Sequence, residues 1–197
     1  FTLVELLVTL MITGVLLAGF LGLASFQVST TRDQTAQVDL QQTVRDVAEM
    51  FAREVRRAGA NPTCATAFSA VEFASTWMLR VKSDLNGNGI IDTVGDEDVS
   101  YQYYSGDLRR IANGSIEVLL KNISWAGSTI RYYDETGAVL AISETYNGLS
   151  STKRARVRRV EFVLDIEQKT TNGETIRARA SSDVGLRNRF FINQPSC

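Results

Sequence analysis

The residues whose types and spacing best suit a chemical role form a short run rich in Asp, Asn and Gly at residues 84–92. Side-chain oxygens at its first, third, fifth and ninth positions, with glycine at the sixth, match the first part of an EF-hand-type calcium loop. The seventh residue would bind through its carbonyl. Because the twelfth is Gly95, the acidic residues after it would close the site from a shifted register. The alternative is a metal-free surface turn, since Asn and Gly favour turns in any case. The predicted calcium ligands are Asp84, Asn86, Asn88, Ile90, Asp92 and Asp96.

Catalysis by the usual side chains has little support in the composition. The 197 residues include no histidine, which removes the commonest general base and every Ser-His or Cys-His arrangement. No cluster of carboxylates or lysines suggests another chemistry. A formal net charge of −1 gives no reason to expect nucleic acid as a partner. We therefore expect no enzymatic activity.

The two cysteines, Cys64 and Cys197, suit neither a zinc site nor a Cys-x-x-Cys redox pair. An oxidising compartment would favour a disulfide between them. Because the closed loop would be long, chain-entropy arguments give such a bond about 4–5 kcal/mol. The alternative is two unpaired thiols.

The elements that must position these residues begin with a long apolar segment. No residue in 6–31 is charged, and 6–26 alone is apolar enough to cross a bilayer, because about 20 helical residues span the hydrocarbon core. An uncleaved secretory signal would show a basic segment before a shorter apolar run. The length and composition of the segment therefore predict a membrane-spanning helix and not a secretory signal.

Glu5 is the charged residue at the start of this segment. A carboxylate near the end of a membrane helix is costly unless it is paired, and such residues are usually functional. Two interpretations stay open from its charge alone. The carboxylate pairs with the α-amino group of Phe1, in the same chain or in a neighbouring subunit, or it reaches into the lipid headgroups.

The first eight residues, Phe-Thr-Leu-Val-Glu-Leu-Leu-Val, resemble the mature start of class III signal-peptide substrates, which are the type IV pilins and the pseudopilins of type II secretion. The resemblance implies that a prepilin peptidase cuts before Phe1 and that the new amine is methylated. It also implies an assembly role for Phe1 and Glu5, in which the carboxylate pairs with the amine of an adjacent subunit. Many major pilins have a helix-breaking proline near the position of Gly22, so this chain departs from them there.

Beyond the apolar segment the hydrophobic residues follow a helical period, and charged residues, among them Glu54, are expected on the remaining surface. Gly59 and Pro62 supply a stop. We predict one helix of about 60 residues, with a membrane or filament-core segment at 1–30 and an amphipathic continuation at 31–60. The shared apolar face comprises Leu40, Val44, Val47, Phe51 and Val55.

From residue 61 onward the hydrophobic period shortens toward two, and Asn-Gly dipeptides separate the apolar runs. An antiparallel sheet against the amphipathic half of the helix would bury both apolar faces. We therefore predict an α+β fold of the pilin type, with a long N-terminal helix packed on a β-rich head at 61–197. Strands are predicted at 71–81, 99–104, 116–123, 129–133, 139–142, 156–166 and 175–180.

A basic run at 153–159 raises the question of nucleic acid. If residues 154–166 form a strand, alternation places Arg154, Arg156 and Arg158 on one face. The balanced net charge favours a solvated or subunit-pairing face over DNA binding.

Two further regions, 54–62 and 81–110, resemble minor pilins of the PilW-like kind and J-type pseudopilins. The resemblance implies a role in initiating assembly at or near a filament tip. We predict a structural subunit, minor or main, of a type IV pilus-like filament. One alternative is a pseudopilin of a type II secretion system, and another is a monomeric membrane-anchored calcium-binding or adhesive module.

The resemblance also sets the expected partners and location. The partners are other pilin subunits and a prepilin peptidase, with no nucleic acid. The chain is expected to cross the inner membrane once before assembly and then to enter an extracellular filament or a periplasmic pseudopilus.

Overall fold

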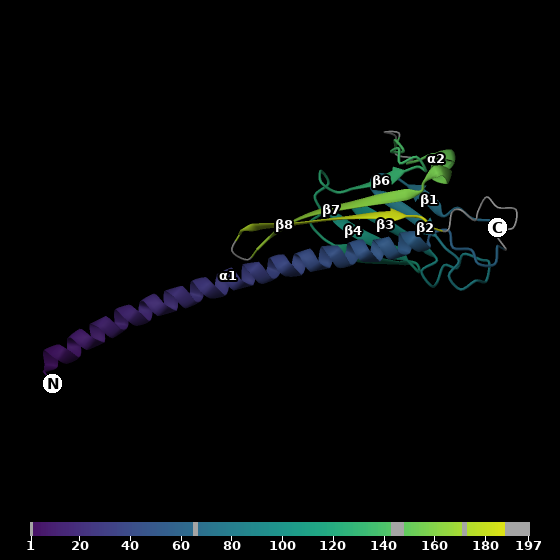
Figure 1. The fold of residues 1–197 in the computed structure, drawn as a ribbon. Helices are drawn as coiled ribbons and strands as arrows, with labels where there is room; N and C mark the ends of the chain where they lie inside the picture. Colours follow the sequence, from purple (N-terminus) through teal and green to yellow (C-terminus); the bar gives the residue numbers. More distant parts are fainter. Residues whose placement is uncertain (1, 65–66, 143–147, 171–172, 188–197) are drawn as a thin grey trace.

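The computed structural model of the chain describes residues 2–64, 67–142, 148–170 and 173–187. A single long helix, α1 (Leu3–Arg57), extends from a β-rich head, and only its second half lies against that head (Figure 1). Its 55 residues give it a length of about 80 Å. The helix curves gently along this length (Figure 1).

The end of α1 lies where the sequence predicts it. Arg56 and Arg57 occupy the last turn, where cations interact favourably with the helix dipole. Ala58 then adopts an extended conformation, and Gly59 has a φ of 78°, which a residue with a side chain rarely adopts. The predicted apolar face is buried from Val44 onward, so the amphipathic continuation is confirmed.

Five consecutive antiparallel strands form the larger sheet, in the order β1-β2-β3-β4-β5. Two of its hairpins have two-residue turns, Ser105-Gly106 and Asn113-Gly114, in which both residues have positive φ. Such turns match the twist of the flanking strands, which is why Asn-Gly is a strong hairpin signal. The strands are β1 (Val71–Ala74), β2 (Met78–Lys82), β3 (Asp98–Tyr104), β4 (Asp107–Ala112) and β5 (Ser115–Leu120).

A second antiparallel sheet has the order β6-β7-β8 and contains β6 (Thr129–Tyr133), β7 (Arg159–Lys169) and β8 (Thr175–Gly185). A short helix, α2 (Ser151–Arg156), precedes β7, and the Ser150 hydroxyl caps it. The second half of α1 packs mainly along β8 and partly on β7. Figure 1 shows α1 running beside both sheets.

The core lies where the helix meets the two sheets. The Phe51 ring of α1 stacks on Phe162 of β7 with 4.0 Å between centroids, and meets Tyr101 of β3 edge-on at 5.0 Å. All three side chains are fully buried. One helix residue therefore links both sheets, and the predicted packing of an amphipathic helix on an antiparallel head is confirmed.

Several predicted strands need correction. The strand at 71–81 is a hairpin of β1 and β2, because the Ser75 hydroxyl accepts from the N–H groups of Trp77 and Met78 and so closes a turn. The segment 139–142 is not a strand and makes only an isolated bridge between Val139 and Tyr133. Strand β4 and helix α2 were not predicted. Because residues 151–156 are helical, Arg154 and Arg156 do not alternate on a strand.

Candidate functional site: the N-terminal helix and its attachment to the head

Glu5 lies in a capping box at the start of α1. The Glu5 N–H donates to the Thr2 hydroxyl and the Thr2 N–H donates to Glu5 Oε2, both at 3.4 Å. These bonds satisfy two backbone donors that a helix N-terminus otherwise leaves without partners. The Thr-x-x-Glu spacing is a sequence signal for this motif, and the sequence interpretation above did not use it. Phe1 lies outside the described residues, so its pairing with Glu5 stays a prediction.

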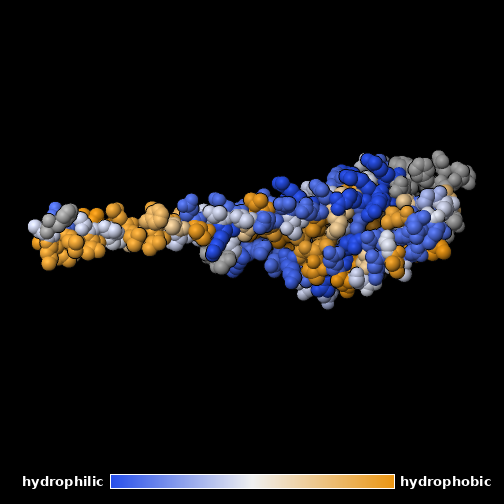
Figure 2. Space-filling model, turned by 90° about the horizontal axis from the view of Figure 1, so that it is seen from below, coloured by the Kyte–Doolittle hydropathy of each residue, from blue (hydrophilic) through white to orange (hydrophobic). Residues whose placement is uncertain are grey.

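The first half of α1 presents apolar side chains on all sides. Leu3, Phe20 and Leu23 are 77%, 69% and 71% exposed. Figure 2 shows the apolar side chains gathered along this arm. By length and composition the helix is able to cross a membrane. An apolar arm that the chain itself leaves uncovered needs lipid or other subunits around it.

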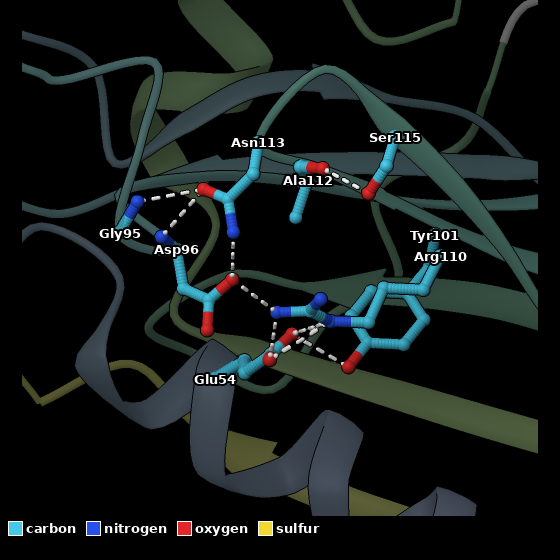
Figure 3. A network of polar contacts seen from close by, with 8 residues as sticks. All are labelled: Glu54, Gly95, Asp96, Tyr101, Arg110, Ala112, Asn113 and Ser115. Carbon is cyan, nitrogen blue, oxygen red and sulfur yellow. Dashed lines mark hydrogen bonds and ion pairs between the residues drawn. The ribbon is translucent and has the colours of Figure 1, made fainter.

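A buried ionic network attaches the second half of α1 to the larger sheet (Figure 3). Glu54 is only 8% exposed, and its carboxylate accepts a hydrogen bond of 2.6 Å from the Tyr101 hydroxyl. Arg110 of β4 donates to the same carboxylate through Nη2 at 2.7 Å and through Nε at 3.1 Å. Both of these bonds end on Oε1, while Oε2 accepts from Tyr101, so each oxygen of the buried carboxylate has a close donor.

Arg110 also reaches the loop before β3, because its Nη2 lies 2.8 Å from Asp96 Oδ1. The Asn113 side chain accepts from the N–H groups of Gly95 and Asp96 and donates to the Asp96 carboxylate. Figure 3 shows this chain of contacts running from α1 through Arg110 to the β4–β5 turn. The helix, two strands and the loop at 84–97 are therefore held by one set of hydrogen bonds.

The pKa values of this network follow from burial and charge. Burial, and then the adjacent Glu54 carboxylate, raise the pKa of Tyr101 well above its usual range. Burial alone would lower the pKa of Arg110, but its hydrogen bonds to Glu54 and Asp96 outweigh that effect and raise it. Arg110 is therefore charged and Tyr101 a neutral hydrogen-bond donor at every physiological pH.

Glu54 corrects the sequence interpretation, which placed it on the solvated side of the helix. It follows Val47 and Phe51 by steps of seven and three, so the helical period itself places it on the buried face. A carboxylate on that face requires a partner, which indicates a buried network. The identity of the partners, Tyr101 and Arg110, depends on strand pairing and has no local signal in the sequence.

The proposed calcium loop is ordered by carboxylates that bind backbone groups. Asp84 is 1% exposed and accepts from the N–H groups of Gly87 and Gly89. Glu97 is 2% exposed and accepts from the N–H groups of Leu85, Asn86 and Asp92. The structure thus brings one end of the predicted loop against Glu97, one of the acidic residues expected to close it.

The two asparagines of the loop direct their amide nitrogens toward Asp92. Asn86 Nδ2 and Asn88 Nδ2 each lie 2.8 Å from Asp92 Oδ2, while their amide oxygens accept from the N–H groups of Asn88 and Ile90. A calcium ion needs those oxygens, so both amides would have to rotate. Within the described residues no group of three or more acidic or cysteine side chains is placed to hold a metal.

The remaining predicted residues lie as follows. Cys64 has a φ of 53°, and its predicted partner Cys197 lies outside the described residues, so the disulfide stays a prediction. Arg156 and Arg159 of the basic run pair with Asp134 and Asp183.

A long helix whose apolar half is exposed and whose polar half packs on antiparallel sheets defines a pilin-like α+β protein. The chain belongs to the family described as prepilin peptidase-dependent protein B (PpdB), which matches residues 33–189. This match covers more than half of the chain and includes the head and the polar half of α1. Comparison with curated proteins and with solved structures gave no significant match.

Proposed function

We propose that this chain is a structural subunit of a type IV pilus-like filament, assembled through α1. The observation that supports the proposal is the contrast between the two halves of one continuous helix. The first half is exposed and apolar, and the second is fixed to the head through Phe51 and the Glu54 network. A head rigidly attached to an uncovered apolar rod is suited to bundling of the rods.

The resemblance of residues 54–62 and 81–110 to PilW-like minor pilins favours a minor over a main subunit. The family name states dependence on prepilin peptidase, and the first eight residues resemble the mature start of that peptidase's substrates. On this proposal the peptidase cuts before Phe1 and the chain is held in the inner membrane before assembly. A pseudopilin of a secretion system has the same architecture and is the alternative.

Sheared surface filaments test this proposal. Full-length chain with an epitope tag in the exposed Gly137 turn should be found in the filament fraction, by immunoblot and by gold labelling in electron micrographs. Sparse or terminal labelling supports a minor subunit, and uniform labelling a main one. If the chain stays in the membrane while filaments form normally without it, the filament role is wrong.

We also propose calcium binding at residues 84–97, as an accessory property of the head. Asp84 and Glu97 are almost fully buried, yet among the described residues neither forms an ion pair with a lysine or arginine. Backbone N–H groups stabilise both carboxylates, but no described lysine or arginine balances their two negative charges. A calcium ion would supply that charge, with ligands from Asp84, Asn86, Asn88 and Asp92 after rotation of the amides, and from the carbonyl of Ile90. Asp96, the sixth predicted ligand, instead pairs with Arg110 and Asn113.

A further inference from the structure

The outer edge of β5 differs from the other three sheet edges in the part of the chain that the structure describes. Along β1, the Leu149 N–H donates to the Ala74 carbonyl, and α2 packs beside the strand. Along β6, the Leu140 N–H donates to the Tyr132 carbonyl. Helix α1 runs along β8 (Figure 1). For β5 the described residues provide no hydrogen-bond partner outside β4, so this edge is open.

The geometry of the β4–β5 hairpin determines which backbone groups of β5 point outward. In a two-residue hairpin the residues that flank the turn, here Ala112 and Ser115, form a hydrogen-bonded pair. Figure 3 shows these two residues on opposite sides of the turn. Because bonded and non-bonded pairs alternate along an antiparallel ladder, Glu117 bonds to β4, whereas Ile116 and Val118 direct their N–H and C=O groups away from it. A further strand could bond to both residues.

The side chains along this edge are apolar where the backbone groups point outward. Ile116 and Val118 are 62% and 42% exposed, and they lie on the same face of the sheet. Glu117, between them, is exposed on the opposite face, and its carboxylate forms no ion pair with any described residue. An exposed apolar edge with unused backbone groups is the kind of strand to which another strand adds.

We propose that β5 is the docking edge for a strand from the head of a different filament subunit. The added strand runs antiparallel to residues 116–118 and places a lysine or arginine opposite Glu117. Its backbone bonds to Ile116 and Val118, and its apolar side chains on either side of the cation pack beside those two residues. The inference rests on the proposed filament function, which brings the heads of different subunits together.

The charge of Glu117 disfavours a second copy of this chain as the occupant. Antiparallel self-pairing that uses every outward group sets Ile116 opposite Val118, and Glu117 then lies opposite Glu117 of the other copy. Like charges directly opposite in an antiparallel pair are destabilising. A shift of register by two residues removes this contact but gives up half of the hydrogen bonds. A strand with a cation at this position keeps all of them and neutralises Glu117.

The charges next to Glu117 also favour an incoming cation. Arg110 is the residue opposite Glu117 on β4, but it is already bound to Glu54 and Asp96. Three carboxylates therefore share one guanidinium group, and negative charge is in excess at this end of the edge. A lysine or arginine on the added strand supplies the missing positive charge.

Photocrosslinking in cells that assemble the filament tests the edge. A photoreactive amino acid replaces Val118 in the full-length chain, and ultraviolet light is applied to sheared filaments. We expect a crosslink to a different subunit, and mass spectrometry should place it in a strand where a lysine or arginine lies between two apolar residues. A crosslink only to a second copy, a crosslink to a segment without such a cation, or no crosslink in filaments that contain the chain overturns the proposal.

Charge reversal tests the pairing with Glu117. Glu117→Lys should lower the yield of the crosslink by roughly three- to fivefold, because it sets two cations opposite each other. Reversal of the identified cation to glutamate in the partner should restore the yield in the Glu117→Lys chain. Glu174→Lys, which reverses an exposed carboxylate between β7 and β8, is the matched control and should leave the yield unchanged. An unchanged yield for Glu117→Lys, or no restoration, overturns the pairing.

Ile116→Pro tests the backbone contact. Proline removes the outward N–H, which the ladder with β4 does not use, so the strand itself is retained. The crosslink should fall by about fivefold or more, because a hydrogen bond is lost and the ring fills the place of the donor. Ile116→Val keeps the N–H and should retain most of the yield. Thermal unfolding in detergent checks that each head folds, and Glu117→Lys serves as the test if the proline variant unfolds.

The outcomes separate this docking edge from the filament function. If the wild-type chain enters filaments but neither Glu117→Lys nor a folded Ile116→Pro changes the crosslink, docking at β5 is wrong while the filament function stands. If the wild-type chain never enters filaments, the filament function itself fails.

Discussion

The Tyr101 hydroxyl lies 2.6 Å from Glu54 Oε2, so a strand at the centre of the larger sheet donates a buried hydrogen bond to the long helix. Arg110 neutralises the same carboxylate from the next strand. Helix–head attachment in this chain therefore depends on polar contacts as well as on the ring of Phe51.

Replacement of Glu54 by alanine should lower the free energy of unfolding by about 3–5 kcal/mol, because it leaves the Arg110 cation and the Tyr101 hydroxyl without their buried partner. Thermal and denaturant unfolding of the full-length chain in detergent, followed by tryptophan fluorescence, would measure the change. Glu49→Ala, on the exposed side of the same helix, is the control and should cost less than about 0.5 kcal/mol. Equal effects of the two substitutions would contradict a stabilising role for the network.

Glu5→Gln should separate the two roles of Glu5. Glutamine preserves the capping-box hydrogen bond to the Thr2 N–H but removes the charge. If the carboxylate pairs with an amine of a neighbouring subunit, Glu5→Gln should enter the membrane normally and be largely lost from sheared filaments, measured by quantitative immunoblot. Glu5→Ala removes both the capping hydrogen bond and the charge, so its level in sheared filaments should be no higher than that of Glu5→Gln. Normal filament levels for Glu5→Gln would assign Glu5 to helix capping alone.

Stability should depend on pH through the Tyr133–Glu161 pair. The Tyr133 hydroxyl donates to the Glu161 carboxylate and, with Arg131, holds the pKa of that carboxyl below its usual value of 4.5. Because the pKa is lower in the folded state, the stabilisation is present above pH 4.5 and is lost as the pH falls through the folded-state pKa.

Tyr133→Phe should therefore lower the Tm at pH 7 and have a much smaller effect at pH 3. Tyr104→Phe, at an exposed tyrosine of β3, should show no such pH dependence. A penalty for Tyr133→Phe that is the same at both pH values would exclude the Glu161 carboxylate as its source.

Gly148→Ala should destabilise the head by about 2 kcal/mol or more. A Cβ at this position would overlap the Ala74 carbonyl oxygen, which accepts the adjacent Leu149 N–H, and φ is +65°. Gly137→Ala is the matched control, since φ is +81° but no atom lies within 4 Å of the new Cβ. It should cost only the left-handed backbone strain, about 1 kcal/mol. Similar unfolding free energies for the two variants would show that the backbone around Gly148 shifts to accommodate the added methyl group.

Calcium should bind the full-length chain with millimolar or tighter affinity and raise its Tm. Isothermal calorimetry in detergent should give a heat that Asp84→Asn abolishes, whereas Asp46→Asn on the helix should retain it. Magnesium should give a weaker response, because it requires a tighter octahedral cage. No heat at millimolar calcium would leave residues 84–97 as a loop ordered by its own carboxylates.

The sequence by itself determined the long helix and the tight hairpin turns, which depend on residues close together in the chain. An uncharged run at 6–31 and a helical period through Phe51 and Val55 were enough for α1, and Asn113-Gly114 for a hairpin. These features report short-range geometry, because helical and hairpin contacts join residues only a few positions apart.

Tertiary structure decided which distant residues meet. Tyr101 and Arg110 reach Glu54 across 47 and 56 positions of sequence, and the strand order places them there. The division of the head into two sheets, and the burial of Asp84 and Glu97, likewise follow from packing. Such contacts depend on strand register and on how the helix and the sheets pack around the core. Neither can be predicted from the residues next to a given position in the sequence.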